Sequence, residues 1–84
     1  MGGYGRMKYY AVWAWNGVAV FNNWEKADYC MDLYLVKPRC KAFSTFWEAE
    51  SHAIFEYNCL RDNPLEDYHG DLKVNTIVFR KNMK

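Results

Sequence analysis

The side chains in this sequence that are best suited to chemistry surround a single histidine. His52 has Glu48 and Glu56 four residues away on either side, so a helix would place one imidazole and two carboxylates in a row. Such a row is able to ligate a metal ion, although it is more often a solvated, salt-bridged helix face. Cys59 with His52 is a second candidate, for a nucleophile and its base. We favour the solvated face over either reading.

No other residues predict catalysis. Glu66, Asp67 and Asp71 fall in a predicted loop, and no facing carboxylate pair is evident for acid–base work. The glycines of the first five residues precede every predicted element, so they do not form a phosphate-binding loop between a strand and a helix. We therefore expect a protein that is not an enzyme and that needs no metal and no cofactor.

Length and composition point to one small folded domain. The chain has 84 residues, of which 51% are hydrophobic and 19% aromatic, and this supply of rings argues against disorder. Its apolar runs are too short to cross a bilayer, and no secretory signal is evident. Cys30, Cys40 and Cys59 are odd in number and lack paired metal-ligand spacing, which favours reduced thiols in the cytoplasm.

The near-neutral net charge of +1 hides a segregated pattern. Residues 1–45 carry +3, residues 46–71 carry −6, and residues 72–84 carry +4. A dedicated nucleic-acid-binding protein is usually more basic as a whole. Any nucleic-acid surface must therefore concentrate its positive charge on one face.

The first half of the chain predicts a hairpin followed by a helix. Residues 9–15 and 18–21 read as strands, and Asn16-Gly17 between them is a strong signal for a turn with φ > 0 at both positions. Asn22 is the predicted N-cap of the helix, and Lys37-Pro38 its end. Its expected inward-facing residues recur at helical spacing: Trp24, Ala27, Cys30, Met31 and Tyr34.

The second half predicts a strand, a helix and a last strand. Residues 39–43 alternate, and Thr45 with Glu48 forms a capping box for a helix that runs to about Leu60. Its inward stripe is expected to be Phe46, Ala49, Ala53, Tyr57 and Leu60. Residues 64–71 read as a loop with a turn at His69-Gly70, and residues 72–79 as the last strand. Three parts follow: a flexible lead (1–7), a ββαβα domain (8–62) and an extension with a strand packed on it (63–84).

An ordered series of short motifs runs through residues 10–50: Tyr10-Ala11-Val12, Val20-Phe21, Trp24, Lys41-Ala42-Phe43, Thr45 and Glu48-Ala49-Glu50. This series resembles the N-terminal hybrid-binding domain of ribonucleases H, also called the caulimovirus viroplasmin domain, over about residues 8–58. The resemblance implies an α+β fold in which a small three-stranded antiparallel sheet packs on two helices. The strand near the C-terminus would be an addition to that fold.

The resemblance also implies a function. Domains of this family bind RNA–DNA hybrid or double-stranded RNA across the shallow minor groove, and a tethered nuclease does the cutting. Carried over to this chain, the binding residues that the resemblance implies are Trp24 and Lys41. Tyr10, Arg39 and Lys37 are further candidates for the same surface. The three cations are also suited on their own chemistry to neutralise phosphates. The expected partner is thus an RNA-containing duplex.

The same residues have structural explanations. Trp24 and Tyr10 could belong to the core, and lysine is common on solvated edge strands. Trp13 and Trp15 share one expected face of the hairpin, either packed under the last strand or exposed for recognition. Two departures from the family also stand out: Cys40 replaces a strand aromatic, and the loop at Lys37-Pro38 lacks small residues.

An alternative function follows from these departures and from the acidic stretch between Glu48 and Asp71. A protein-interaction module could reuse the fold and bind the basic groove of a nucleic-acid enzyme, as phage-encoded inhibitors do. Separately, the last strand could pair with its copy in a second chain to give a homodimer.

Overall fold

The computed structural model describes residues 8–60 and 72–79, and it has the α+β fold predicted from the sequence. Its elements, in chain order, are β1 (Tyr9–Ala14), β2 (Gly17–Phe21), α1 (Trp24–Tyr34), β3 (Arg39–Phe43), α2 (Phe46–Cys59) and β4 (Thr76–Phe79). The predicted lead, the loop with its His69-Gly70 turn and residues 80–84 lie outside the described residues. Within the described ranges, neither helix combines the length and apolar character needed to span a membrane.

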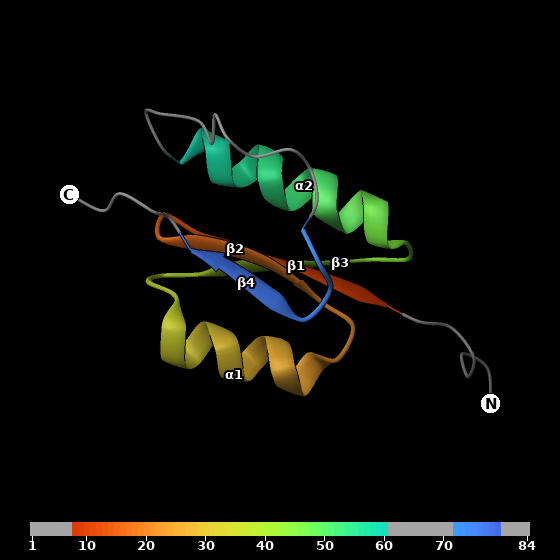
Figure 1. Ribbon diagram of the computed structural model, residues 1–84, viewed down its shortest axis with the longest axis horizontal. Coiled ribbons are helices and arrows are strands. Elements are labelled where there is room, and N and C mark those ends of the chain that lie inside the picture. The colour runs from red at the N-terminus through yellow and green to blue at the C-terminus, as the bar shows by residue number, and fades with distance from the viewer. Residues whose placement is uncertain (1–7, 61–71, 80–84) are drawn as a thin grey trace.

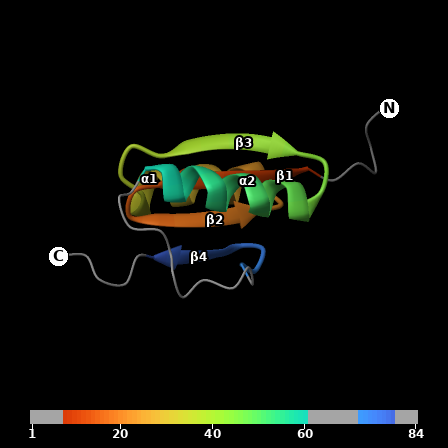
Figure 2. The same ribbon diagram turned by 90° about the horizontal axis from the view of Figure 1, so that it is seen from above.

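The four strands form one antiparallel sheet in the order β3-β1-β2-β4 (Figure 2). The last strand therefore extends the predicted three-stranded sheet along its β2 edge instead of packing elsewhere on the domain. The two helices cover opposite faces, α2 above the sheet and α1 below it in Figure 1. Because side chains alternate along a strand, each strand contributes side chains to the core on the α1 face and to the core on the α2 face.

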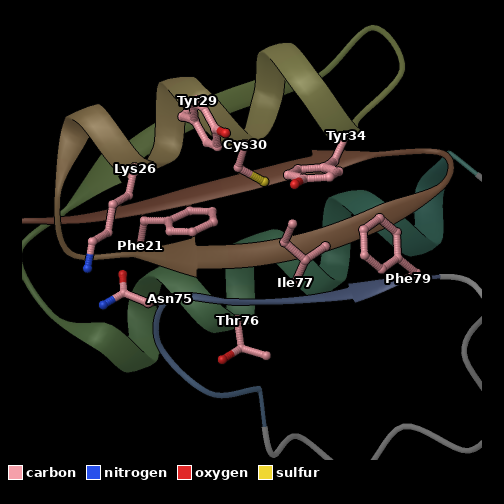
Figure 3. Close-up of a pocket in the computed structure, with 9 residues that line it drawn as sticks. All are labelled: Phe21, Lys26, Tyr29, Cys30, Tyr34, Asn75, Thr76, Ile77 and Phe79. Carbon is pink, nitrogen blue, oxygen red and sulfur yellow. The ribbon is translucent and has the colours of Figure 1, made fainter.

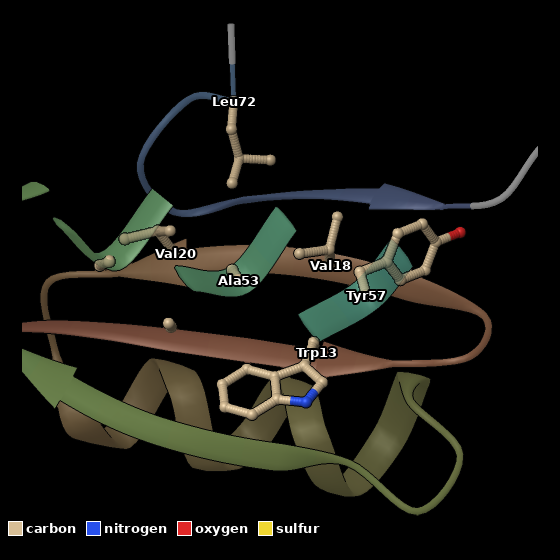
Figure 4. Close-up of a cluster of buried hydrophobic side chains, with 8 residues drawn as sticks. Trp13, Val18, Val20, Ala53, Tyr57 and Leu72 are labelled. Carbon is tan, nitrogen blue, oxygen red and sulfur yellow. The ribbon is translucent and has the colours of Figure 1, made fainter. Parts of the chain in front are cut away.

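The core on the α2 side combines two alanines and a tyrosine of the helix with apolar residues of the sheet (Figure 4). Ala49, Ala53 and Tyr57 of α2 are buried against Trp13 and its neighbours on β1 and β2. Leu72, which precedes β4, joins the same cluster and is only 3% exposed. Leu72 is thus part of the main core, and Val78 of β4 packs against it.

The core on the α1 side is smaller. Ala27 and Cys30 of α1, with Leu35 just beyond the helix, pack on Val12, Ala14, Ala19 and Phe21 of the sheet. Trp24 and Tyr34 were predicted to face inward here, but each is half exposed. The helix is short, and its small buried residues let it lie close to the sheet, which leaves the large rings at its two ends outside.

The hairpin turn lies one residue earlier than predicted. Ala14 pairs with Gly17, so Trp15 and Asn16 form the turn, and neither has a positive φ. Trp15 is exposed in this turn, whereas Trp13 is buried under α2, so the two do not act as one surface. Gly17 serves a different need: a Cβ there would lie 3.1 Å from Leu35 Cδ2 and 3.2 Å from the Val78 carbonyl oxygen.

The helix caps follow the sequence closely, with one shift. Asn23, not Asn22, caps α1 by accepting from the Lys26 amide, because β2 continues through Phe21 and leaves Asn22 in the bend. Thr45 caps α2 as predicted; its hydroxyl accepts from the Glu48 amide and donates to the Glu48 carboxylate. Leu60, expected in the inward stripe, is instead the exposed C-cap residue.

The last strand is shorter than predicted, because a turn occupies residues 74 and 75. Asn75 has a φ of 64°, a left-handed conformation that asparagine tolerates better than most residues. Its amide donates to the Val20 carbonyl, and its side-chain oxygen accepts from the Asn22 amide. These bonds fix the start of β4 to the connection between β2 and α1.

Asn16 fastens the end of α1 to the hairpin. Its side chain donates to the Tyr34 carbonyl at 3.0 Å and accepts from the Val36 amide at 3.1 Å. We predict that Asn16→Ala lowers the free energy of unfolding by about 1–2 kcal/mol, since it removes two hydrogen bonds. Urea denaturation measures this, and Asn16→Asp, which keeps only the acceptor, is expected to lose about half as much. An unchanged midpoint for Asn16→Ala would contradict the assignment.

Candidate nucleic-acid interface

The most prominent exposed aromatic contact of the predicted set joins Trp24 and Tyr10. Trp24 is the first residue of α1, and its ring lies on Tyr10 of β1 with centroids 5.5 Å apart and planes at 59°. The Asn23 cap fixes where α1 begins and thereby where this ring stands. Trp24 remains 49% exposed, so the contact holds the indole in place without burying it. A held, accessible ring is suited to pack against a sugar or a base.

The three predicted cations lie on or beside the neighbouring edge strand. Arg39 and Lys41 are exposed on β3, which pairs with β1 alone among the described strands, and Lys37 is exposed in the loop before it. None of the three forms an ion pair with any described residue. The only described partner of Lys41 is the ring of Phe43, whose centroid lies 5.6 Å from Nζ. These charges are available to an anionic ligand.

The register of β3 places the predicted residues on two faces of the sheet. Lys41 pairs with Ala11 and Arg39 with Trp13, whose side chains belong to the α2 side. Tyr10 pairs with Ala42 and points with Trp24 to the α1 side. The aromatic pair and the cations therefore do not share a flat surface. They meet only around the free edge of β3.

Lys37 has a left-handed backbone conformation in the loop between α1 and β3. Its φ is 51°, and it directly precedes Pro38. Leu35 is buried and the Val36 amide is held by Asn16, so the loop is anchored immediately before Lys37. Such a conformation costs a residue other than glycine roughly 1–2 kcal/mol, and it is retained only where surrounding contacts impose it.

Cys40 occupies the position at which the resemblance in the sequence implies an aromatic side chain. It is half buried on β3 opposite Val12 and packs against the α1-side core. Burial raises the pKa of the Cys40 thiol, and it raises the pKa of Cys30 to about 11. Both thiols therefore stay protonated and weakly reactive at neutral pH. The face beside Trp24 has one ring fewer than the resemblance implies.

The histidine row does not assemble a metal centre. His52 lies between the rings of Trp13 and Phe43, with centroids 5.0 and 5.1 Å away, and its Nε2 is 3.6 Å from Glu56. Glu48 is instead engaged by the Thr45 cap. Cys59 is seven residues from His52, about 10 Å along the helix axis, which is too far for a nucleophile and its base. In the described part of the chain, no three potential metal ligands cluster.

Several exposed rings were not anticipated. Tyr29, Tyr34 and Phe79 stand along one side of α1 and on β4, and Trp47 and Phe55 stand on the outer side of α2. The signal was present in the sequence, since Tyr29, Trp47 and Phe55 fall outside the inward stripes of their helices. Large rings at outward positions are typical of binding surfaces.

No family model, curated protein or solved structure matches the chain. The resemblance to the hybrid-binding domain thus stays a prediction from the sequence, and the interface is interpreted from its own geometry.

Proposed function

We propose that the protein is a non-catalytic module that binds RNA-containing duplexes, either RNA–DNA hybrid or double-stranded RNA, along its β3 edge. The observation that carries this proposal is the exposed Trp24 ring, held on Tyr10, beside a free strand edge with three cations that form no ion pair among the described residues. The family resemblance in the sequence favours the same residues.

The split between the two faces fits a curved ligand. A duplex backbone that runs along β3 would meet Lys41 and Arg39 on one side of the strand and the Trp24–Tyr10 pair on the other. Phosphates would contact the cations, and the indole would contact a sugar in the wide, shallow minor groove of an A-like helix. Long, flexible Lys and Arg side chains can reach around an edge that a short side chain could not.

Fluorescence anisotropy tests the proposal directly. Labelled blunt RNA–DNA hybrid, double-stranded RNA and double-stranded DNA of one sequence are titrated with the protein at low and moderate salt. We expect the two RNA-containing duplexes to bind more tightly than DNA, with affinity that falls as salt rises. No binding of any duplex at low salt would overturn the proposal.

Two substitutions test the site. Trp24→Ala is expected to weaken hybrid binding about tenfold, the usual scale for one lost stacking contact. Lys41→Ala is expected to weaken it less and to reduce the slope of log K against log salt by about one. The controls are Trp47→Ala and Lys73→Ala, which remove an exposed indole from α2 and a cation from beside β4. The site would be misplaced if both controls weakened hybrid binding as much as Trp24→Ala and Lys41→Ala do.

A second candidate function has its own observation. Helix α2 has three glutamates and no Lys or Arg, and it exposes Trp47 and Phe55 by 65% and 63%. An exposed tryptophan with an acidic surround is suited to a basic-rimmed pocket on a partner protein. Since Leu72 is in the core, deleting residues 63–84 would disturb the fold, and Trp47→Ala is the cleaner test. This candidate requires a protein partner whose binding is lost in Trp47→Ala and kept in Trp24→Ala.

A further inference from the structure

An open groove runs between α1 and β4 on the face of the sheet opposite α2 (Figure 3). It exists because β4 widens the sheet beyond the area that α1 covers. Phe21 and Ile77 form part of its floor, and Tyr29 and Cys30 of α1 form one wall. Its volume is about 570 Å³, a size typical of sites for small organic groups.

The two ends of the groove differ chemically. Figure 3 shows Tyr34 and Phe79 together at one end, and their ring centroids lie 6.4 Å apart. Lys26 and Asn75 stand at the other end. Tyr34 and Phe79 are each 49% exposed, so their rings present free surface to a ligand.

The charge that the described residues place in the groove is positive. Lys26 is the one charged side chain among the described residues that line it, and it forms no ion pair with any of them. Exposed rings beside a cation are suited to single-stranded nucleic acid, because bases stack on the rings and a phosphate pairs with the cation.

We propose that this groove binds unpaired nucleotides of a single strand. The inference rests on the proposed function, since it extends the duplex site to a strand that continues beyond the duplex. The two sites meet at the first turn of α1: Trp24 faces the β1 and β3 side, and Lys26, two residues later, faces the groove. A single strand that leaves a duplex on the β3 edge would cross this turn and place its bases on Tyr34 and Phe79.

A second copy of the chain is a poorer occupant. Pairing of β4 with its copy would extend the sheet beyond β4, at its outer edge. The groove lies on the face of the sheet between β4 and α1, so it would stay open in such a dimer.

The test compares three labelled RNA–DNA hybrids of one sequence by anisotropy: blunt, with a ten-nucleotide 3′ single-stranded tail, and with the same tail at the 5′ end. Single-stranded U10 and dT10 are titrated alongside. We expect one tail polarity to tighten binding about tenfold over the blunt hybrid, because a tethered strand binds at high effective concentration. Phe79→Ala and Tyr29→Ala are each expected to remove this gain and to leave blunt-hybrid affinity unchanged. Trp47→Ala is expected to keep the gain.

The blunt and tailed duplexes separate the two proposals. Loss of blunt-hybrid binding in Trp24→Ala, with U10 binding retained, supports the groove independently of the duplex site. The groove proposal is overturned if neither tail tightens binding and U10 and dT10 do not bind at low salt. It is also overturned if light scattering shows a dimer that Phe79→Ala dissociates, since the groove would then be covered by a second copy. Tyr29 is 63% exposed, so Tyr29→Ala keeps the test valid if Phe79→Ala does not fold.

Discussion

Trp13→Ala is expected to lower the free energy of unfolding by about 3–5 kcal/mol, the range for removing a buried indole from a core. Trp13 is 6% exposed and lies under α2, next to the imidazole of His52 at 5.0 Å between centroids. A domain of 84 residues has a total stability of roughly 4–13 kcal/mol. The loss is therefore a large fraction of the total stability, and the urea midpoint should fall markedly. Urea denaturation followed by circular dichroism measures it.

Trp47→Ala provides a matched control, because it removes the same side chain from a site that is 65% exposed. Its expected effect is within about 0.5 kcal/mol of the parent protein, as for most surface substitutions. Equal losses for the two variants would contradict the packing of Trp13 between the sheet and α2. The comparison also shows how much a buried tryptophan and an exposed one each contribute to stability, since Trp13 is of the first kind and Trp47 of the second.

The sequence was sufficient to predict those elements whose signals are local. Strand β3 has the predicted bounds 39–43, and Thr45 caps α2 as its capping box requires. The errors fall where two neighbouring residues carry the same signal. Asn22 and Asn23 are equally good caps, and the pairing of Phe21 with Tyr10 in β2 selects the second. Asn16 is in the turn but does not adopt the predicted positive φ. Its side chain instead holds the end of α1 through two hydrogen bonds.

The candidate site was only partly predictable, because it depends on pairing between distant segments. The sequence named Trp24 and Lys41 as binding residues, and both are exposed, although Trp24 was also expected in the inward stripe of its helix. It gave no indication that they lie on opposite faces, since this depends on whether Lys41 pairs with Ala11 or with the next residue along β1, and a shift of one residue exchanges the faces. The groove beside β4 was not anticipated for the same reason: it requires the pairing of residues 17–20 with residues 76–79.

Gly17→Val is expected to separate β4 from the rest of the sheet and to lower stability by about 2–3 kcal/mol, as overpacking commonly does. A Cβ at Gly17 would lie 3.1 Å from Leu35 Cδ2, which can rotate away, and 3.2 Å from the Val78 carbonyl oxygen, which cannot move without shifting β4. Amide hydrogen exchange should therefore show loss of protection in Ile77 and Val78, while β1 and β3 retain theirs. Gly17→Ala, which adds one methyl group, is expected to show a smaller effect in the same direction.

Gly17→Val also distinguishes the two proposed binding surfaces. It does so by displacing a strand, without changing any side chain that is proposed to contact a ligand. In the sheet, β1 and β2 lie between β4 and β3. Release of β4 therefore removes Ile77 and Phe79 from the groove but leaves Trp24, Tyr10 and Lys41 in place. Gly17→Val should then bind blunt hybrid like the parent protein and gain nothing from a single-stranded tail. Unchanged protection of Val78 would show that the sheet accommodates the valine. A tail that still tightened binding after β4 had separated would place the single strand elsewhere on the molecule.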